Sequence, residues 1–107
     1  MEKVEQDLEK MGALAQEIMK MAIEALRDHN TDLARIVIQK DDEIDNLEIV
    51  VQEKIERMAS TESRVKFDIR RELATIKIAR DLERIGDYAT NIAEVVLELK
   101  NEQYIKP

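Results

Sequence analysis

The 107-residue sequence has no cysteine and contains only two glycines, one proline, two tyrosines and one phenylalanine. The absence of cysteine excludes disulfides, thiolate metal ligands and a cysteine nucleophile. Because the single proline is the last residue, no internal position is forced to break a helix. No run of about 18 apolar residues occurs, so we expect no transmembrane segment. The first residues lack the basic and then apolar pattern of a signal peptide, which favours a cytoplasmic protein.

Positive charge is also scarce, since 17 Lys and Arg residues stand against 24 Asp and Glu residues, a net charge of −7. Nucleic-acid binding depends on neutralising phosphates with Lys and Arg, so this balance argues against a nucleic-acid-binding protein. The charge is uneven, because residues 64–84 contain 7 bases and 4 acids, whereas residues 1–63 contain 8 bases and 16 acids. The basic block either faces an acidic partner or complements two acidic helices of the same molecule.

Aliphatic residues at helical spacing are abundant, and hydrophobic residues make up 44% of the chain. Apolar residues that recur in steps of four and three predict three helices, over about residues 2–28, 31–59 and 64–101. Short connections place consecutive helices side by side in opposite directions. We therefore predict an all-α fold, an elongated antiparallel three-helix bundle that forms a single domain. The predicted core stripes are Val4, Leu8, Met11, Ala15, Ile18, Ala22 and Ala25 in the first helix, Val37, Ile44, Val51, Ile55 and Met58 in the second, and Ile78, Leu82, Ile85, Ala89, Ile92, Val96 and Leu99 in the third.

Polar segments mark the two predicted connections. In "RDHNTD" (27–32), Asn30 or Thr31 is a suitable N-cap for the second helix. The segment "ASTES" (59–63) is rich in hydroxyl residues that can cap the start of the third helix. The only histidine, His29, falls in the first of these connections, where exposure to solvent is expected.

Carboxylates interrupt the hydrophobic pattern of the second helix. Asp41 takes a position where the spacing calls for an apolar residue, and Asp45 follows one turn later. The third helix repeats this arrangement with Glu83 and Asp87, and Asn91, a weaker candidate, lies one turn further on. Two helices therefore each offer a pair of acids four residues apart beside the core.

Side chains four residues apart on a helix lie close enough to bind one metal ion or to bridge two. If the two pairs faced each other, four carboxylates would provide an all-oxygen site suited to hard cations such as Mg²⁺, Ca²⁺, Mn²⁺ or ferric iron. Gly86, in the middle of the third helix, would allow a neighbouring group to approach closely. The alternative is that these acids lie on solvated helix faces without a ligand.

Two stretches, "VIQKDDEIDNLE" (37–48) and "FDIRRELATIKIARDLERIGDYATNIAE" (67–94), resemble the two signature stretches of the PhoU family. This resemblance implies an all-α fold in which each repeat is a three-helix bundle. The family's metal motif, an acid-x-x-x-Asp pair on each of two helices, matches Asp41 with Asp45 and Glu83 with Asp87. The resemblance implies bound metal ions, iron or zinc first and Mn or Mg as other possibilities.

Two features differ from the family pattern. The sequence "TESRVKFDIR" has no proline before its Asp-Ile-Arg stretch, where family members often carry one. Typical members also contain two tandem repeats, whereas this sequence contains one. We therefore expect a fragment of a two-repeat protein, and a homo-oligomer, with a dimer the simplest, that covers the apolar surface of the lone repeat.

The resemblance implies a cytoplasmic negative regulator of phosphate uptake that is not an enzyme. Such a regulator acts through contacts with the phosphate ABC transporter and a sensor histidine kinase. A metal-free structural adaptor bundle is the main alternative. A carboxylate di-iron enzyme is disfavoured, because ferritin-like sites use Glu-x-x-His motifs and His29 lies in a predicted turn.

Overall fold

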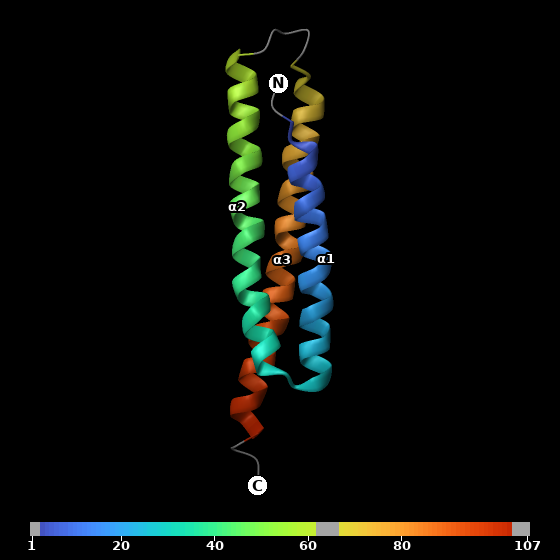
Figure 1. Ribbon diagram of the computed structural model, residues 1–107, viewed down its shortest axis with the longest axis vertical. Coiled ribbons are helices and arrows are strands. Elements are labelled where there is room, and N and C mark those ends of the chain that lie inside the picture. Colours follow the sequence, from blue (N-terminus) through green and yellow to red (C-terminus); the bar gives the residue numbers. More distant parts are fainter. Residues whose placement is uncertain (1–2, 62–66, 104–107) are drawn as a thin grey trace.

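The computed structural model describes residues 3–61 and 67–103, and within these ranges the chain forms three α-helices (Figure 1). They are α1 (Glu5–Asp28), α2 (Thr31–Thr61) and α3 (Ile69–Gln103). Helices α1 and α3 run in one direction and α2 runs in the other (Figure 1). The bundle measures 68 × 17 × 17 Å. The predicted all-α, elongated antiparallel three-helix bundle is therefore confirmed.

The connection between α1 and α2 is a tight turn closed by its own residues. His29 adopts a left-handed backbone conformation with φ of 54°, and its side chain is exposed, as expected. The Asn30 amide donates a hydrogen bond of 2.9 Å to the carbonyl of Ala25, which ends α1. The Asn30 Oδ1 accepts a 3.0 Å hydrogen bond from the amide of Leu33. Asn30 is thus the N-cap that the sequence suggested.

The second helix runs to Thr61, two residues past its predicted end at residue 59. The hydroxyls of Ser60 and Thr61 donate hydrogen bonds of 3.1 and 2.8 Å to the carbonyls of Glu56 and Arg57. These hydroxyls therefore belong to the last turn of α2 and do not cap the next helix. The expectation that they cap the third helix was wrong, because α2 continues through both residues. Their hydroxyls bond instead to backbone carbonyls one turn earlier in that helix.

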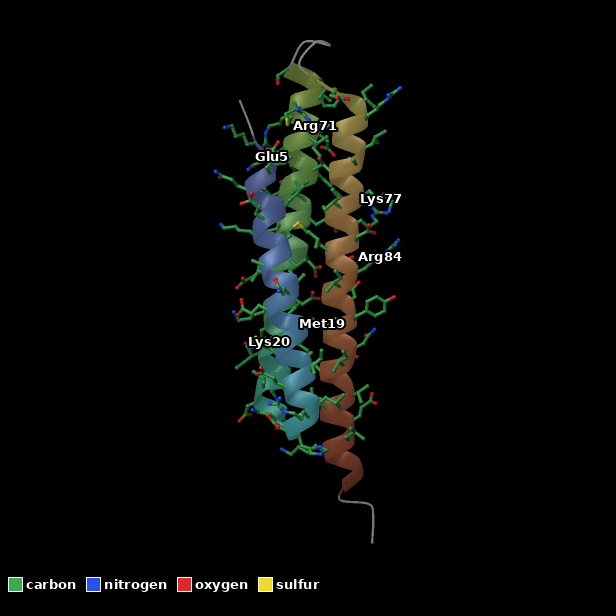
Figure 2. All side chains as sticks on the ribbon, turned by 90° about the vertical axis from the view of Figure 1, so that its right-hand side faces the viewer. Glu5, Met19, Lys20, Arg71, Lys77 and Arg84 are labelled. Atoms are coloured by element: carbon green, nitrogen blue, oxygen red, sulfur yellow. The ribbon has the colours of Figure 1, made fainter. Side chains whose placement is uncertain are left out.

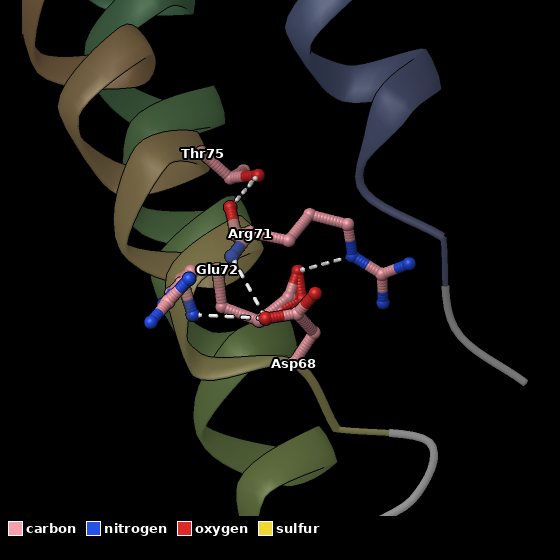
Figure 3. Close-up of polar contacts among 5 residues, drawn as sticks. Asp68, Arg71, Glu72 and Thr75 are labelled. Carbon is pink, nitrogen blue, oxygen red and sulfur yellow. Dashed lines mark hydrogen bonds and ion pairs between the residues drawn. The ribbon is translucent and has the colours of Figure 1, made fainter.

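The third helix begins at Ile69, later than the predicted residue 64. Asp68 caps it, since its Oδ1 accepts hydrogen bonds of 3.0 and 3.3 Å from the amides of Arg70 and Arg71 (Figure 3). An aspartate at this position also interacts favourably with the positive end of the helix dipole. The predicted start, within residues 62–66, lies outside the described residues. The first helix begins at Glu5, and residue 2 of its predicted range 2–28 is likewise outside them.

The core of the bundle follows the predicted stripes of α1 and α2. The largest fully buried side chains are Met11 and Ile18 from α1 and Val37, Ile44 and Val51 from α2. Burial of apolar side chains along the full length of the bundle is the main favourable term in its stability. The buried stripe of α1 comprises Met11, Ala15, Ile18, Ala22 and Ala25.

The predicted core stripe of α3 was partly wrong. Ile78 and Ile85 are 48% and 37% exposed, and the neighbouring Ala79 and Gly86 are buried in their place. Because the bundle is only 17 Å across, α3 packs closely against both other helices with small residues. The larger isoleucines are displaced to the edge of the contact. The buried residues of α3 are Glu72, Thr75, Ala79, Gly86, Ala89, Ala93 and Val96.

Helix α3 is the longest of the three, with 35 residues against 24 in α1 and 31 in α2. Its C-terminal end extends past the turn between α1 and α2 (Figure 1). In spite of this length, none of the helices in the described ranges combines the size and hydrophobicity of a membrane span.

Candidate metal centre

Helices α2 and α3 approach each other closely at Asp41 and Gly86. Asp41 is only 7% exposed, although it is an aspartate in the middle of a helix. A Cβ atom at Gly86 would overlap the Oδ1 of Asp41 and would lie 3.3 Å from the Cδ1 of Ile44. The glycine therefore makes room for the buried carboxylate, which is the close approach that the sequence suggested.

Three of the predicted carboxylates come together at this point. Asp41, Asp45 and Asp87 each offer one oxygen, and these oxygens all lie within 4.8 Å of one another. Asp45 is half-buried and Asp87 is exposed, so the cluster opens towards solvent from a buried base. Oxygen ligands lie about 2.0–2.6 Å from a bound divalent cation, so two of them are at most about 5 Å apart. The spacing of the three oxygens therefore suits a single ion.

The other two predicted residues lie differently. Glu83 is half-buried and is not one of the three clustered acids. Burial and the charge of Asp87 raise the pKa of Glu83 to about 7, so the two side chains are electrostatically linked. Asn91 is exposed and has no hydrogen bond among the described residues. Glu83 thus borders the cluster, whereas Asn91 lies outside it.

The environment of the cluster opposes negative charge. Burial raises the pKa of Asp41 to about 6, with a further contribution from the charge of Asp45. The pKa of Asp45 is raised as well, by burial and then by the charge of Asp87. The Oδ1 of Asp41 has no hydrogen-bond partner. A buried carboxylate oxygen without a partner is costly, so this site favours either a proton or a bound cation.

Two residues near the cluster were not identified as site residues from the sequence. The Thr90 hydroxyl donates a 3.0 Å hydrogen bond to the carbonyl of Gly86. The same hydroxyl lies near Asp41, and it would lower the pKa of that carboxyl if it donated its single hydrogen there instead. The charge of Glu48 contributes to the raised pKa of Glu83. The position of Glu48 in the hydrophobic stripe of α2 was a usable signal, whereas nothing in the sequence distinguished Thr90.

The fold and the cluster together define a three-helix bundle with an all-carboxylate site between two of its helices. Such a site can hold a hard cation, since every donor is an oxygen. The chain belongs to the PhoU domain family, whose pattern matches residues 8–96. The family membership suggested by the two signature stretches is therefore confirmed.

Three relatives show the extent of the similarity. A "phosphate-specific transport system accessory protein PhoU homolog" of Aquifex aeolicus is 39% identical over the whole chain, which covers 48% of that relative. The homolog of Clostridium acetobutylicum is 33% identical over 97% of the chain and 48% of the relative. The PhoU protein of Escherichia coli is 30% identical over 88% of the chain and 39% of the relative. The chain spans about half the length of the curated relatives it matches, and no solved structure matches it significantly.

The two glycines of the chain provide a matched test of the close approach at Gly86. Gly12→Ala should stabilise the protein by up to about 1 kcal/mol, because alanine favours the helix. The added Cβ would have no atom within 4 Å beyond its own stretch of helix backbone. Gly86→Ala should destabilise it by about 1–3 kcal/mol through overlap with Asp41. Urea unfolding of both variants measures the difference. Equal stabilisation by the two substitutions would show that the contact between α2 and α3 is loose.

The raised pKa values predict how the stability of the metal-free protein depends on pH. Asp41 and Glu83 have folded-state pKa values of about 6 and about 7, above their ordinary values of 3.8 and 4.5. The folded chain therefore binds more protons than the unfolded chain between about pH 4 and pH 7, and its stability falls as pH rises through this window. The melting temperature with chelator should drop between about pH 4 and pH 7. Asp41→Asn combined with Glu83→Gln should reduce this drop, and an unchanged drop would contradict the assignment.

Proposed function

We propose that this chain is a metal-binding regulatory domain that acts in phosphate uptake. The observation that carries the proposal is the buried Asp41, whose Oδ1 lacks a hydrogen-bond partner beside Asp45 and Asp87. A polar group that is buried without a partner is rare in a folded protein and needs an explanation. A cation at this point would satisfy that oxygen and would also reduce the repulsion among the acids.

Asp41, Asp45 and Asp87 would hold the ion, and Glu83, which borders the cluster, is the fourth candidate ligand. Iron or zinc is the first choice, by the family resemblance, with manganese or magnesium as alternatives. Carboxylate oxygens suit hard cations, which supports ferric iron, manganese and magnesium on chemical grounds. The ion would connect α2 to α3, so its role in this proposal is to fix the arrangement of two helices.

The regulatory part of the proposal concerns the whole protein. The relatives are named accessory proteins of the phosphate-specific transport system, a description of a non-enzymatic role. We infer that the protein restrains phosphate uptake in the cytoplasm through contacts with the phosphate ABC transporter and a sensor histidine kinase. A bundle that presents long, rigid helix surfaces is suited to action by contact.

A metal-free adaptor bundle is the second candidate, and one observation favours it. Burial, the charge of Asp87 and hydrogen bonding with Asp87 raise the pKa of Glu83 to about 7, so a proton on Glu83 can reduce the repulsion at the site without metal. A di-iron enzyme has less support, because His29 is exposed at the end of α1 and is not a member of the acidic cluster.

Thermal melts with iron, zinc and manganese test the metal site. A metal present at about 100 times its dissociation constant stabilises a folded state that alone binds it by about 2.7 kcal/mol. We therefore expect the melting temperature to rise by several degrees with at least one metal and to fall again with chelator. Asp41→Asn combined with Asp87→Asn should abolish this response.

The same double variant separates the two candidate functions. Without metal, it should be as stable as the wild type or more stable, because it loses repulsion between acids. An adaptor without metal predicts a flat wild-type response and a double variant that is less stable. Asp42→Asn combined with Glu43→Gln, which removes two exposed acids from α2, is the matched control and should keep the metal response.

We also propose that the chain forms a homo-oligomer. Large apolar side chains lie exposed on all three helices, among them Ile23 on α1, Ile49 on α2 and Tyr88 on α3. Covering such residues is favourable in proportion to the apolar area removed from water. Light scattering should detect a dimer or a larger assembly at micromolar concentration. A mass of one chain throughout that range would contradict this part of the proposal.

A further inference from the structure

The side of α3 that faces away from the bundle carries four exposed cations. These cations are Arg70, Lys77, Arg80 and Arg84. Their successive spacings of seven, three and four residues place them within a sector of about 100° around the helix axis. Lys77 and Arg84 project outwards from the bundle in Figure 2. Ile69 and Leu73 share this sector and are among the most exposed large hydrophobic residues of the described chain, at 63% and 61%. We call this surface the basic ridge, formed by Ile69, Arg70, Leu73, Lys77, Arg80 and Arg84.

The cations of the basic ridge are not neutralised by the rest of the bundle. The side chains of Arg70 and Arg80 form no hydrogen bond or ion pair within the described part of the chain. Lys77 and Arg84 both pair with Asp81 of the same helix, at 3.3 and 3.7 Å. The ridge therefore keeps an excess of positive charge.

Ion pairs between helices in the described ranges link α1 with α2 and leave these cations aside. Lys40 pairs with Glu17 at 2.9 Å, and Lys54 pairs with Asp7 at 2.7 Å. Arg71 pairs with Glu72, its own neighbour, at 3.4 Å, and points towards the start of α1 rather than outwards (Figure 3). The sequence allowed two interpretations of the basic block in residues 64–84. The described ion pairs do not support the one in which its cations neutralise acids on α1 and α2 of the same molecule. An external acidic partner remains.

The acids nearest to the ridge do not cover it. Asp68 is occupied in capping the amides of Arg70 and Arg71. Glu83 lies on the flank of α3 towards α2 and borders the candidate metal centre. The exposed Asp87 is a member of that centre and lies beyond the C-terminal end of the ridge, three residues past Arg84. Positive charge beside exposed aliphatic side chains is thus the chemical character of this surface.

We propose that the basic ridge binds an anionic lipid surface. A combination of Lys and Arg with outward-pointing Leu and Ile is typical of helices that lie against anionic membranes. Each cation near such a surface adds to the binding without requiring a particular shape in the partner. The inference rests on the charges and exposure of α3 and is independent of the metal site.

The shape of the ridge favours lipid over an acidic protein. The ridge is one convex helix face about 22 Å long, since 15 residues each rise 1.5 Å. A stable protein interface buries about 800 Å² on each partner, usually with complementary shape, and a single narrow ridge provides much less. Most acids of the chain precede residue 64, on α1 and α2, so repulsion from an anionic surface would orient the bundle with α3 towards it.

Co-sedimentation of the full chain with lipid vesicles tests the proposal. Vesicles of equal parts phosphatidylglycerol and phosphatidylcholine should bind the chain, vesicles of phosphatidylcholine alone should not, and added salt should weaken binding. Arg70→Gln combined with Arg80→Gln should weaken binding roughly 30-fold, because two cations leave the surface. The matched control, Lys20→Gln combined with Arg35→Gln, removes two exposed cations from α1 and α2 and should change binding less than about threefold.

Three results would overturn the lipid proposal. The first is no binding to the anionic vesicles at low salt. The second is an equal loss of binding in the control variant, which would show that net charge alone matters. The third is binding to soluble polyglutamate that depends on Arg70 and Arg80 without binding to vesicles, which would assign the ridge to an acidic protein. Leu73→Gln gives a further check, since it should weaken vesicle binding and leave any polyglutamate binding unchanged.

Discussion

The close approach of α2 and α3 at Gly86 is the contact on which the arrangement of the candidate site depends. The missing side chain leaves the space that the Asp41 carboxylate occupies, and Ile44 packs beside it. The same proximity brings an oxygen of Asp87 from α3 within 4.8 Å of those from Asp41 and Asp45 on α2. A larger residue at position 86 would separate the helices or turn Asp41 away, and in both cases the cluster would be lost. The helix propensity that a glycine sacrifices here is a local cost of forming this site.

Burial of Asp41 gives the molecule a chemical requirement that packing alone does not meet. An aspartate in a core position lowers stability unless a proton, a hydrogen bond or a cation compensates it. The raised pKa of Asp41, which favours a bound proton, and the nearby Thr90 hydroxyl are partial compensations within the chain. The two remaining possibilities, proton and metal ion, have different consequences. If a proton neutralises Asp41, the stability of the contact between α2 and α3 does not depend on the metal concentration. If a metal ion does so, the stability of that contact rises with the metal concentration.

Helix α3 carries three distinct surfaces, and this division explains its composition. Its inner face is built from small residues, including Ala79, Gly86, Ala89 and Ala93, because it packs against both other helices of a narrow bundle. The flank towards α2 carries the acids of the candidate site, and the outer face carries the basic ridge. Large aliphatic residues such as Ile78 and Ile85 are displaced from the inner face to its margin, where they remain partly exposed. The helix thus has little apolar area to contribute to its own core and much to offer to a partner.

Helical spacing and composition alone determined the fold class, the number of helices, the core stripes of α1 and α2 and the N-cap at Asn30. These features depend on local pattern, and a chain of 107 residues with no internal proline has few alternatives to helices. The acid spacing likewise paired Asp41 with Asp45, because residues four apart share a helix face. Only the packing of α2 against α3 brought Asp87 to this pair. The register of α3 was decided only by the tertiary structure. Two stripes, one through Ile78 and Ile85 and one through Ala79 and Gly86, differ by a single residue, and hydrophobicity favours the first. Close packing against two helices favours the second, since steric fit between helices is not encoded in the period of one helix. Tertiary packing also brought Thr90 to Asp41 and left Asn91 exposed, two residues adjacent in sequence that the fold separates onto different faces.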